Sequence, residues 1–250
     1  MPKYLDPKGD FLFGVIFYQA PYRLMSLLNA LLPLPKGVEI KELEYLSKKD
    51  IPENRFKHHS LIIVRCTDSN GRSFIVELLS YWTIFIALFN TICKTATCAT
   101  RIKKGESFTN PTDVYTLCFE NYKYFDYGSG YEYIHEYRIT DPNMLKNGCV
   151  SQTLIVVELP KFNPEIKADR PKKKLWMKFL TQINEQTKDV APELLKEEEI
   201  RQALAITEMT NYSDNEIKEY YHYAFNFWEE IMVEYFSKCV ERYEESKKNG

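Results

Sequence analysis

The sequence contains few of the short motifs that identify enzyme classes. Its six cysteines form no C-x-x-C pair and none of the spacings that bind zinc. It has no glycine-rich phosphate-binding loop and no nucleophile elbow. These absences argue against a thioredoxin-like redox protein, a zinc ribbon, a P-loop nucleotide-binding protein and an α/β-hydrolase.

Long apolar tracts and a strong net charge are also absent. The most apolar tract, residues 78–93, has about 16 residues, whereas a membrane-spanning helix needs roughly 20. Residues 1–10 lack the apolar segment of a secretory signal, so we expect a reduced, cytoplasmic protein with no membrane partner. With 33 basic and 35 acidic residues the net charge is -2, so contact with a nucleic acid would need a local basic patch.

The length and composition predict one principal domain. A chain of 250 residues with 44% hydrophobic residues can bury one large core and carry a helical appendage. Beyond Pro160 the composition changes to helix formers and charged residues. We therefore expect an α/β core over residues 1–165 and a helical region over residues 166–250 that packs on the core or extends it.

The strongest structural signal is a β-hairpin at residues 61–79. Two runs rich in β-branched residues, Leu61 to Cys66 and Ser73 to Leu79, flank the sequence DSNG at residues 68–71, which favours a turn. Neither run alternates between apolar and polar residues, and such runs are typical of strands buried on both faces. We predict that this hairpin lies in the middle of a sheet covered by helices.

One residue of the hairpin is out of place in such a core. Glu77 lies in the sequence IVELL, and a buried carboxylate costs several kcal/mol unless it is paired, protonated or bound to a metal. The position of the turn places Ile63 opposite Glu77, and Leu79 on the same face. A metal-dependent phosphodiesterase needs two or more carboxylates close together, and here both neighbours are aliphatic.

Periodicity and capping signals predict further elements around the hairpin. We expect helices at residues 10–17, 22–32 and 81–103, from Pro171, from Pro192 to about Met209, and after the capping-box sequence SDNE at 213–216; we expect strands at 38–46, 114–119, 131–139 and 153–159. The sheet is then mixed and about six-stranded. The last helix carries an aromatic stripe, which either packs on other C-terminal helices or forms a partner-binding or dimerising face.

Several blocks of sequence, in this order, resemble a known family. They are YLDPK at residues 4–8, D-x-x-F-x-x-I-F at 10–17, LLNALLP at 27–33, S-x-x-x-V-R-C at 60–66, GR-x-FIVE at 71–77, YWT at 81–83, VELPKF at 157–162 and LW-x-x-FLT-x-IN at 175–184. The chain is similar over residues 3–210 to the recombination-promoting nucleases, a group of PD-(D/E)XK nuclease-family transposases.

The resemblance implies a restriction-endonuclease-like fold, that is, a mixed central sheet flanked by helices. It further implies a Mg²⁺-dependent DNA endonuclease of a mobile element, active in DNA recombination. Glu77 matches the glutamate of the family's E-x-Q motif, whereas the metal-binding aspartate is replaced by Ile63 and the glutamine by Leu79. The lysine of the N-terminal motif is replaced by Gly14. The resemblance therefore implies a site in which Glu77 alone would hold a metal.

Other residues are weaker candidates for the site. Asp10, Glu44 or Asp68 could supply a second carboxylate; Asp68 is better explained as a turn former, and Asp10 is favoured because the family's first helix approaches the site. The best basic patch for DNA comprises Arg170, Lys172, Lys173 and Lys174, which could also be a solvated face.

Two hypotheses follow from these residues. In the first, the chain is an endonuclease-type protein of a mobile element that acts on DNA. In the second, it is a catalytically inactive relic that keeps the fold as a DNA-binding or protein-binding module. The losses at Ile63, Leu79 and Gly14 favour a degenerate active site.

Overall fold

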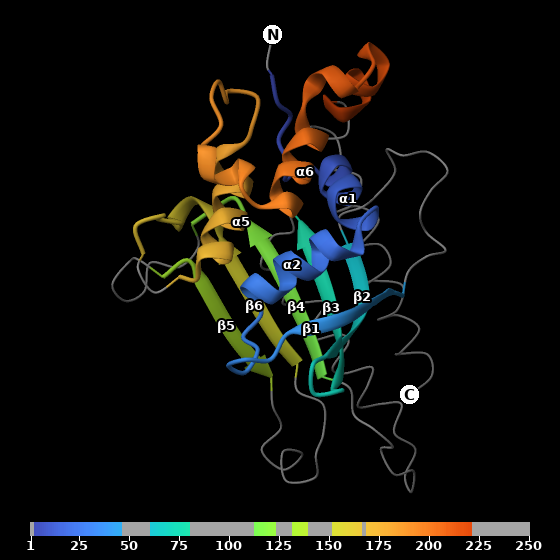
Figure 1. Ribbon diagram of the computed structural model, residues 1–250, viewed down its shortest axis with the longest axis vertical. Helices are drawn as coiled ribbons and strands as arrows, with labels where there is room; N and C mark the ends of the chain where they lie inside the picture. Colours follow the sequence, from blue (N-terminus) through green and yellow to red (C-terminus); the bar gives the residue numbers. More distant parts are fainter. Residues whose placement is uncertain are drawn as a thin grey trace, which may run out of the picture. The chain divides into compact units, whose positions relative to one another are not determined.

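A mixed sheet of six strands organises the first of the two compact units of the chain, residues 1–211; the second unit is residues 212–250. The computed structural model describes residues 3–46, 61–80, 113–123, 132–139, 152–166 and 169–221. The strands are β1 (Ile40–Tyr45), β2 (Leu61–Asp68), β3 (Ser73–Ser80), β4 (Asp113–Glu120), β5 (Ile134–Ile139) and β6 (Gln152–Glu158), in the spatial order β1-β2-β3-β4-β6-β5 (Figure 1). The predicted mixed six-stranded sheet and the α/β fold class are confirmed.

The sheet combines antiparallel and parallel strand pairs. The first three strands form an antiparallel meander, β4 runs parallel to β3, β6 runs parallel to β4, and β5 is antiparallel to β6. All of β6 is buried, as expected for a central strand of continuous apolar sequence. The first strand is less regular, because its register with β2 shifts between Ile40 and Glu42.

Helices α1 (Asp10–Tyr18), α2 (Pro21–Leu31) and α5 (Pro171–Gln182) lie across one face of the sheet (Figure 1). The ring of Phe13 packs against Phe119 of β4, with 6.0 Å between ring centroids, and Phe17 packs against Trp176 of α5 at 5.6 Å. The predicted apolar stripe of the second helix, Leu24, Leu27, Leu28 and Leu31, is buried. Among the described residues no single helix is long and apolar enough to cross a membrane.

The hairpin forms at the predicted turn. Gly71 has φ +77°, which favours glycine, and its N–H donates to the carbonyl of Asp68 at 2.9 Å. The strands β2 and β3 are interior strands, as predicted. The prediction that both arms are buried on both faces is wrong for β2, because Ile63 is half-buried and Arg65 is exposed. A run of β-branched residues suits a pleated strand whether one face or both are covered, so the run alone could not decide burial.

Two helix predictions have different outcomes. The helix expected from Pro192 is wrong at its start: Pro192 begins a short 3-10 turn, η3 (Pro192–Leu195), and the α-helix α6 (Glu198–Thr207) begins only after Glu197 adopts an extended backbone. Glutamates 197–199 favour a helix N-terminus at this point, because the macrodipole stabilises acidic residues in the first turn. The predicted capping box is confirmed, since the Ser213 hydroxyl accepts from the N–H of Glu216 and the Glu216 carboxylate accepts from the N–H of Ser213.

Two of the features expected from the sequence fall on residues that the structure does not describe. The helix expected at 81–103 lies outside the described residues, as does the aromatic stripe beyond Tyr221. The remaining short 3-10 turns are η2 (Leu159–Lys161), which follows β6, and η4 (Met209–Asn211), which follows α6. The η2 turn carries Lys161, whose ammonium group pairs with the carboxylate of Glu158.

Candidate functional site

Glu77 lies in a row of residues that crosses the centre of the sheet. Its Cα partner on the antiparallel strand β2 is Ile63, and its partner on the parallel strand β4 is Thr116. The predicted position of Glu77 opposite Ile63 is therefore confirmed. The Thr116 hydroxyl donates a hydrogen bond to Oε2 of Glu77 at 3.3 Å.

The environment of Glu77 is nearly closed to solvent. Glu77 is 7% exposed and Thr116 is 4% exposed. The two neighbours in the row offer one hydroxyl and one aliphatic side chain, so Glu77 contributes the only carboxylate of these three residues. Across the described part of the chain, no three His, Cys, Asp or Glu side chains are grouped so that they could hold a metal ion.

Asp10 and Gly14 both belong to α1. The position of this helix relative to Glu77 follows from the alternation of side chains along β4. Side chains alternate along β4, so Phe119, three residues after Thr116, lies on the face opposite to Glu77. Since Phe13 of α1 packs on Phe119, this helix covers that opposite face. Gly14 is buried within α1, and the side chains of Asp10 and Leu79 lie outside the described part. A ligand role for Asp10 stays a prediction.

The other two carboxylates considered for the site make local contacts. Asp68 Oδ1 accepts from the N–H groups of Asn70 and Arg72 at 2.9 and 3.0 Å, and Oδ2 accepts from Arg72 Nε at 3.1 Å. Burial alone would raise the pKa of Asp68, but these hydrogen bonds and the charge of Arg72 lower it below its ordinary value. Glu44 of β1 pairs with Arg65 of β2 at 2.8 Å, and both of these side chains are exposed to solvent. Asp68 is thus a turn former, as its sequence position indicated.

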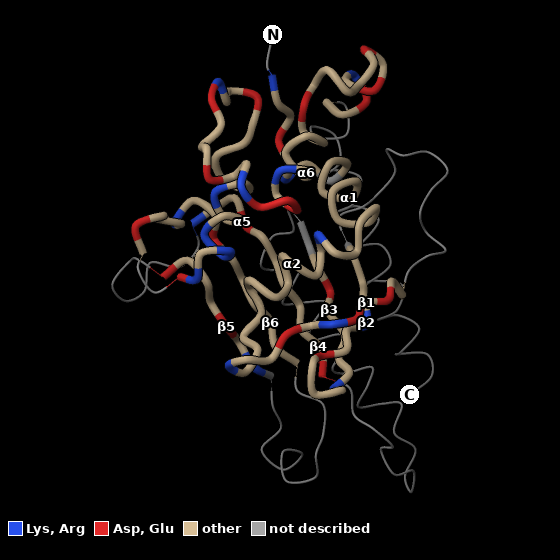
Figure 2. The backbone as a smooth tube through the Cα atoms, in the orientation of Figure 1, with Lys and Arg blue, Asp and Glu red and all other residues tan. Residues whose placement is uncertain are grey.

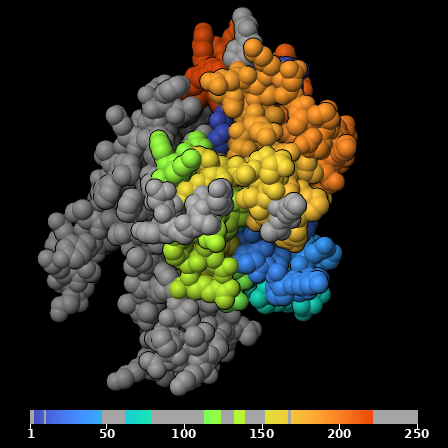
Figure 3. Space-filling model, turned by 90° about the vertical axis from the view of Figure 1, so that its left-hand side faces the viewer, coloured from blue at the N-terminus to red at the C-terminus, as the bar shows by residue number. Residues whose placement is uncertain are grey.

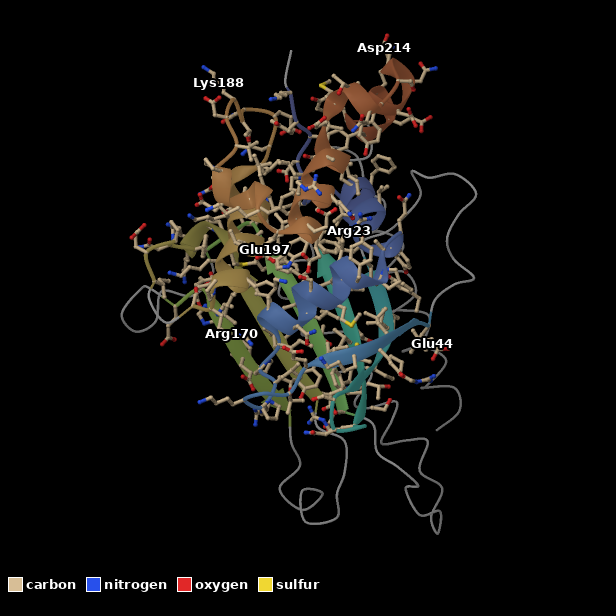
Figure 4. The ribbon with its side chains drawn as sticks, in the orientation of Figure 1. Arg23, Glu44, Arg170, Lys188, Glu197 and Asp214 are labelled. Carbon is tan, nitrogen blue, oxygen red and sulfur yellow. The ribbon has the colours of Figure 1, made fainter. Side chains whose placement is uncertain are left out.

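Three cations of the basic run at the start of α5 have partners within the chain. Arg170 Nη2 donates to the carbonyls of Asn29 and Ala30 at 3.0 and 3.1 Å, at the last turn of α2. Lys172 pairs with two glutamates at the start of α6, and Lys173 pairs with the carboxylate of Asp169. Figure 2 shows basic α5 residues beside acidic residues at the start of α6, and Figure 4 labels Arg170 and Glu197.

The fourth cation of the run differs from the other three. Among the described residues, Lys174 has no acidic partner. In the side view, the yellow segment that begins α5 lies against the blue residues at the end of α2 (Figure 3), in agreement with the Arg170 contacts. Phosphate binding by this run stays a prediction, and binding by Arg170, Lys172 or Lys173 would compete with these intrachain contacts.

A second polar cluster, not predicted from the sequence, lies on the face of the sheet that carries Glu77. Glu120 and Glu158 are Cα partners on the parallel strands β4 and β6, and they are 2% and 0% exposed. His135 Nε2 and Lys161 Nζ lie 2.7 and 2.6 Å from Oε2 of Glu158. The available signal was a glutamate directly after each of two apolar runs, LCF and IVV, but nothing in the sequence indicated that these strands were neighbours.

The comparisons with known proteins identify one family. The family model described as PD-(D/E)XK nuclease family transposase matches residues 7–232. No curated protein and no solved structure matches the chain. The match covers every strand of the sheet and the helices α1, α2, α5 and α6.

Proposed function

The chain belongs to the PD-(D/E)XK nuclease family of transposases, and on that premise we propose that it is a mobile-element protein whose endonuclease site is degenerate. The family implies DNA as the substrate and a divalent metal as the cofactor. The finer proposal concerns this copy: it keeps the nuclease fold and the glutamate at position 77, but it does not cut DNA by the family's metal-dependent route.

The observation that carries the proposal is the pairing of Glu77 with Ile63. Mg²⁺ requires near-octahedral oxygen coordination and gives up its waters reluctantly, so a single protein carboxylate binds it only weakly. Of the two described residues that flank Glu77 in the sheet, Ile63 offers no oxygen and Thr116 offers a hydroxyl that donates to the carboxylate. Among the described residues, these two neighbours of Glu77 do not complete a site for the metal that the family uses.

The burial of Glu77 supports the same proposal. A carboxylate that is 7% exposed is largely shielded from water, so a hydrated cation would have to lose waters to reach it, and Mg²⁺ gives up its waters reluctantly. Its hydrogen bond from Thr116 gives it a structural role within the sheet. Glu77 in this chain then stabilises the β3–β4 pair and holds no metal.

The second candidate function is a binding module for DNA or for another protein. Lys174 favours a DNA contact, because it is the member of the basic run that has no acidic partner among the described residues. A homodimer through the aromatic stripe of the last helix, and a cytoplasmic location, both stay predictions.

A plasmid-nicking assay tests the proposal. The full-length protein, with Mg²⁺ or Mn²⁺ and supercoiled plasmid, should give no more nicked circles than the Glu77→Ala variant gives under the same conditions. The Glu77→Ala protein is the matched control because it removes the retained family carboxylate and leaves any contaminating nuclease unchanged. Metal-dependent nicking that is present in the unmodified protein and lost in Glu77→Ala would overturn the proposal and would make Asp10 the first candidate for the missing ligand.

A further inference from the structure

Strand β5 forms one edge of the sheet. Among the described strands it has a neighbour on one side only, the antiparallel strand β6. It is the leftmost strand of Figure 1, and its residues reach the surface in Figure 3, which views the molecule from that side. The opposite edge, β1, has a register shift between Ile40 and Glu42, and such irregularities protect an edge from pairing. The register of β5 with β6 has no such shift.

The register of β5 shows which of its backbone groups face the open edge. The N–H of Glu158 donates to the carbonyl of Tyr133 at 2.8 Å. In an antiparallel pair, residues that exchange hydrogen bonds alternate with residues that do not. Counting in twos from Tyr133, the odd-numbered residues of β5 direct their N–H and C=O groups toward β6. The even-numbered residues, Ile134, Glu136 and Arg138, direct these groups away from β6.

Glu136 and Arg138 also carry opposite charges on this edge. Their side chains are 32% and 64% exposed, and Arg138 Nη2 lies 2.6 Å from Oε1 of Glu136. An exposed ion pair contributes little to stability, because water and salt screen it. Each of these charges can therefore exchange its present partner for another one at little cost.

A second copy of the chain can pair with this edge without placing like charges together. An antiparallel pair of β5 strands forms hydrogen bonds where outward residues of both copies face each other. A two-fold axis at Glu136 or at Arg138 would place each of these charges opposite its own copy, which destabilises a strand pair. An axis at His135 would place Glu136 opposite Ile134.

An axis at Tyr137 places the opposite charges together. Glu136 of each copy then faces Arg138 of the partner subunit, and these two residues exchange backbone hydrogen bonds as well as pairing their charges. We propose that the chain forms a homodimer through β5 in this register, so that two sheets join into one. A contact that is one strand wide is smaller than the usual stable interface, so the dimer is weak and depends on concentration.

This inference goes beyond the proposed function, because it uses neither Glu77 nor the basic run of α5. It also differs from a dimer through the aromatic stripe of the last helix, since the contact lies on the edge of the sheet. Variants of β5 distinguish the two surfaces, because they leave the last helix unchanged.

Sedimentation velocity of the full-length protein over a range of concentrations tests the dimer. The unmodified protein should show a monomer–dimer equilibrium. Glu136→Arg and Arg138→Glu each turn two attractive pairs into two repulsive ones, so each variant alone should associate at least about tenfold more weakly. A mixture of the two variants should associate again, because arginines of one copy then face glutamates of the other. Arg65→Glu, which reverses an exposed charge on β2, is the matched control and should associate like the unmodified protein.

Disulfide formation tests the register independently of these charges. In this register Tyr137, which is 37% exposed, faces its own copy at a Cα separation of about 4.5 Å, which a disulfide can span. Tyr137→Cys should therefore give a disulfide-linked dimer on mild oxidation, well above the level of the unmodified protein. Glu136→Cys is the control, because its own copy lies roughly 8 Å away and beyond the reach of a disulfide.

Four results would overturn the proposal. They are an unmodified protein that stays monomeric at every concentration, a dimer that persists unchanged in both folded charge variants, a mixture of these variants that does not associate, and a Tyr137→Cys protein that forms no more linked dimer than the unmodified protein. The second result would assign the dimer to another surface.

Discussion

Ile63 lies directly across the β2–β3 hairpin from Glu77, so the strand position that faces this buried carboxylate is aliphatic. In a pair of antiparallel strands, directly opposed side chains are the closest neighbours on one face. A metal ligand at position 63 would therefore reach the same ion as Glu77, and no rotamer of isoleucine can replace it. The other partner, Thr116, contributes a hydroxyl that donates to Glu77.

Restoring the family residues should restore cleavage. We expect that Ile63→Asp combined with Leu79→Gln and Gly14→Lys will nick supercoiled plasmid in the presence of Mg²⁺, at least tenfold above the unmodified protein, because two carboxylates and a held water are then available. The single variant Ile63→Asp should remain close to background. Gly14 is buried in α1, so the double variant without Gly14→Lys should be assayed beside the triple variant.

The interpretation of that experiment depends on folding. Each variant should first be compared with the unmodified protein by circular dichroism and urea unfolding. If the folded triple variant shows no metal-dependent nicking, the absence of a carboxylate at position 63 is not what disables the site.

Asp68 should make the hairpin more stable at neutral pH than at acid pH. Replacing Asp68 by alanine removes three hydrogen bonds from the turn, so the free energy of unfolding at pH 7 should fall by about 1–3 kcal/mol. Because the folded protein lowers the pKa of Asp68, its contribution is present above the ordinary value of 3.8 and is lost as the pH falls through the lower folded value. Urea unfolding of both proteins across this range measures the difference.

The matched control for this prediction is Asp68→Asn, which keeps an acceptor oxygen for the two backbone N–H groups but carries no charge. It should lose less stability than Asp68→Ala at pH 7. Its free energy of unfolding should also decrease less on acidification than that of the unmodified protein. An Asp68→Ala protein whose stability difference stays constant down to about pH 2 would contradict the assigned role.

Substitution of Arg170 and of Lys174 should distinguish a structural role of the basic run from a role in DNA binding. Arg170→Ala removes the donor to the Asn29 and Ala30 carbonyls, so it should lower the free energy of unfolding by about 1–2 kcal/mol. Lys174→Ala, on the same helix, should change stability by less than about 0.5 kcal/mol. Urea unfolding measures both values.

DNA binding of the same two variants can be measured by fluorescence anisotropy with a labelled duplex over a series of salt concentrations. If this run contacts phosphates, Lys174→Ala should weaken binding and reduce the salt slope by about one. Unchanged binding and slope in Lys174→Ala would remove the basic run as a DNA contact.

The sequence by itself determined the features whose causes are local. The DSNG turn sets the register of the hairpin, so the pairing of Ile63 with Glu77 follows from counting residues back from the turn, and Gly71 supplies the positive φ that the turn uses. The same holds for the capping box at Ser213 and for the apolar stripe of α2, because caps and helical periodicity involve residues within a few positions of each other.

Only the tertiary structure decided which distant residues meet. Glu120 and Glu158 become neighbours because β6 is inserted between β4 and β5, an order that the strand sequences do not specify. The sequence presents a simple basic run at the start of α5, but in the structure Arg170 donates to backbone carbonyls at the end of α2 and Lys172 pairs with glutamates at the start of α6. Packing between elements far apart in the chain buries Glu120 and Glu158, and this desolvation, absent from any local pattern, raises the pKa of Glu120 to about 7.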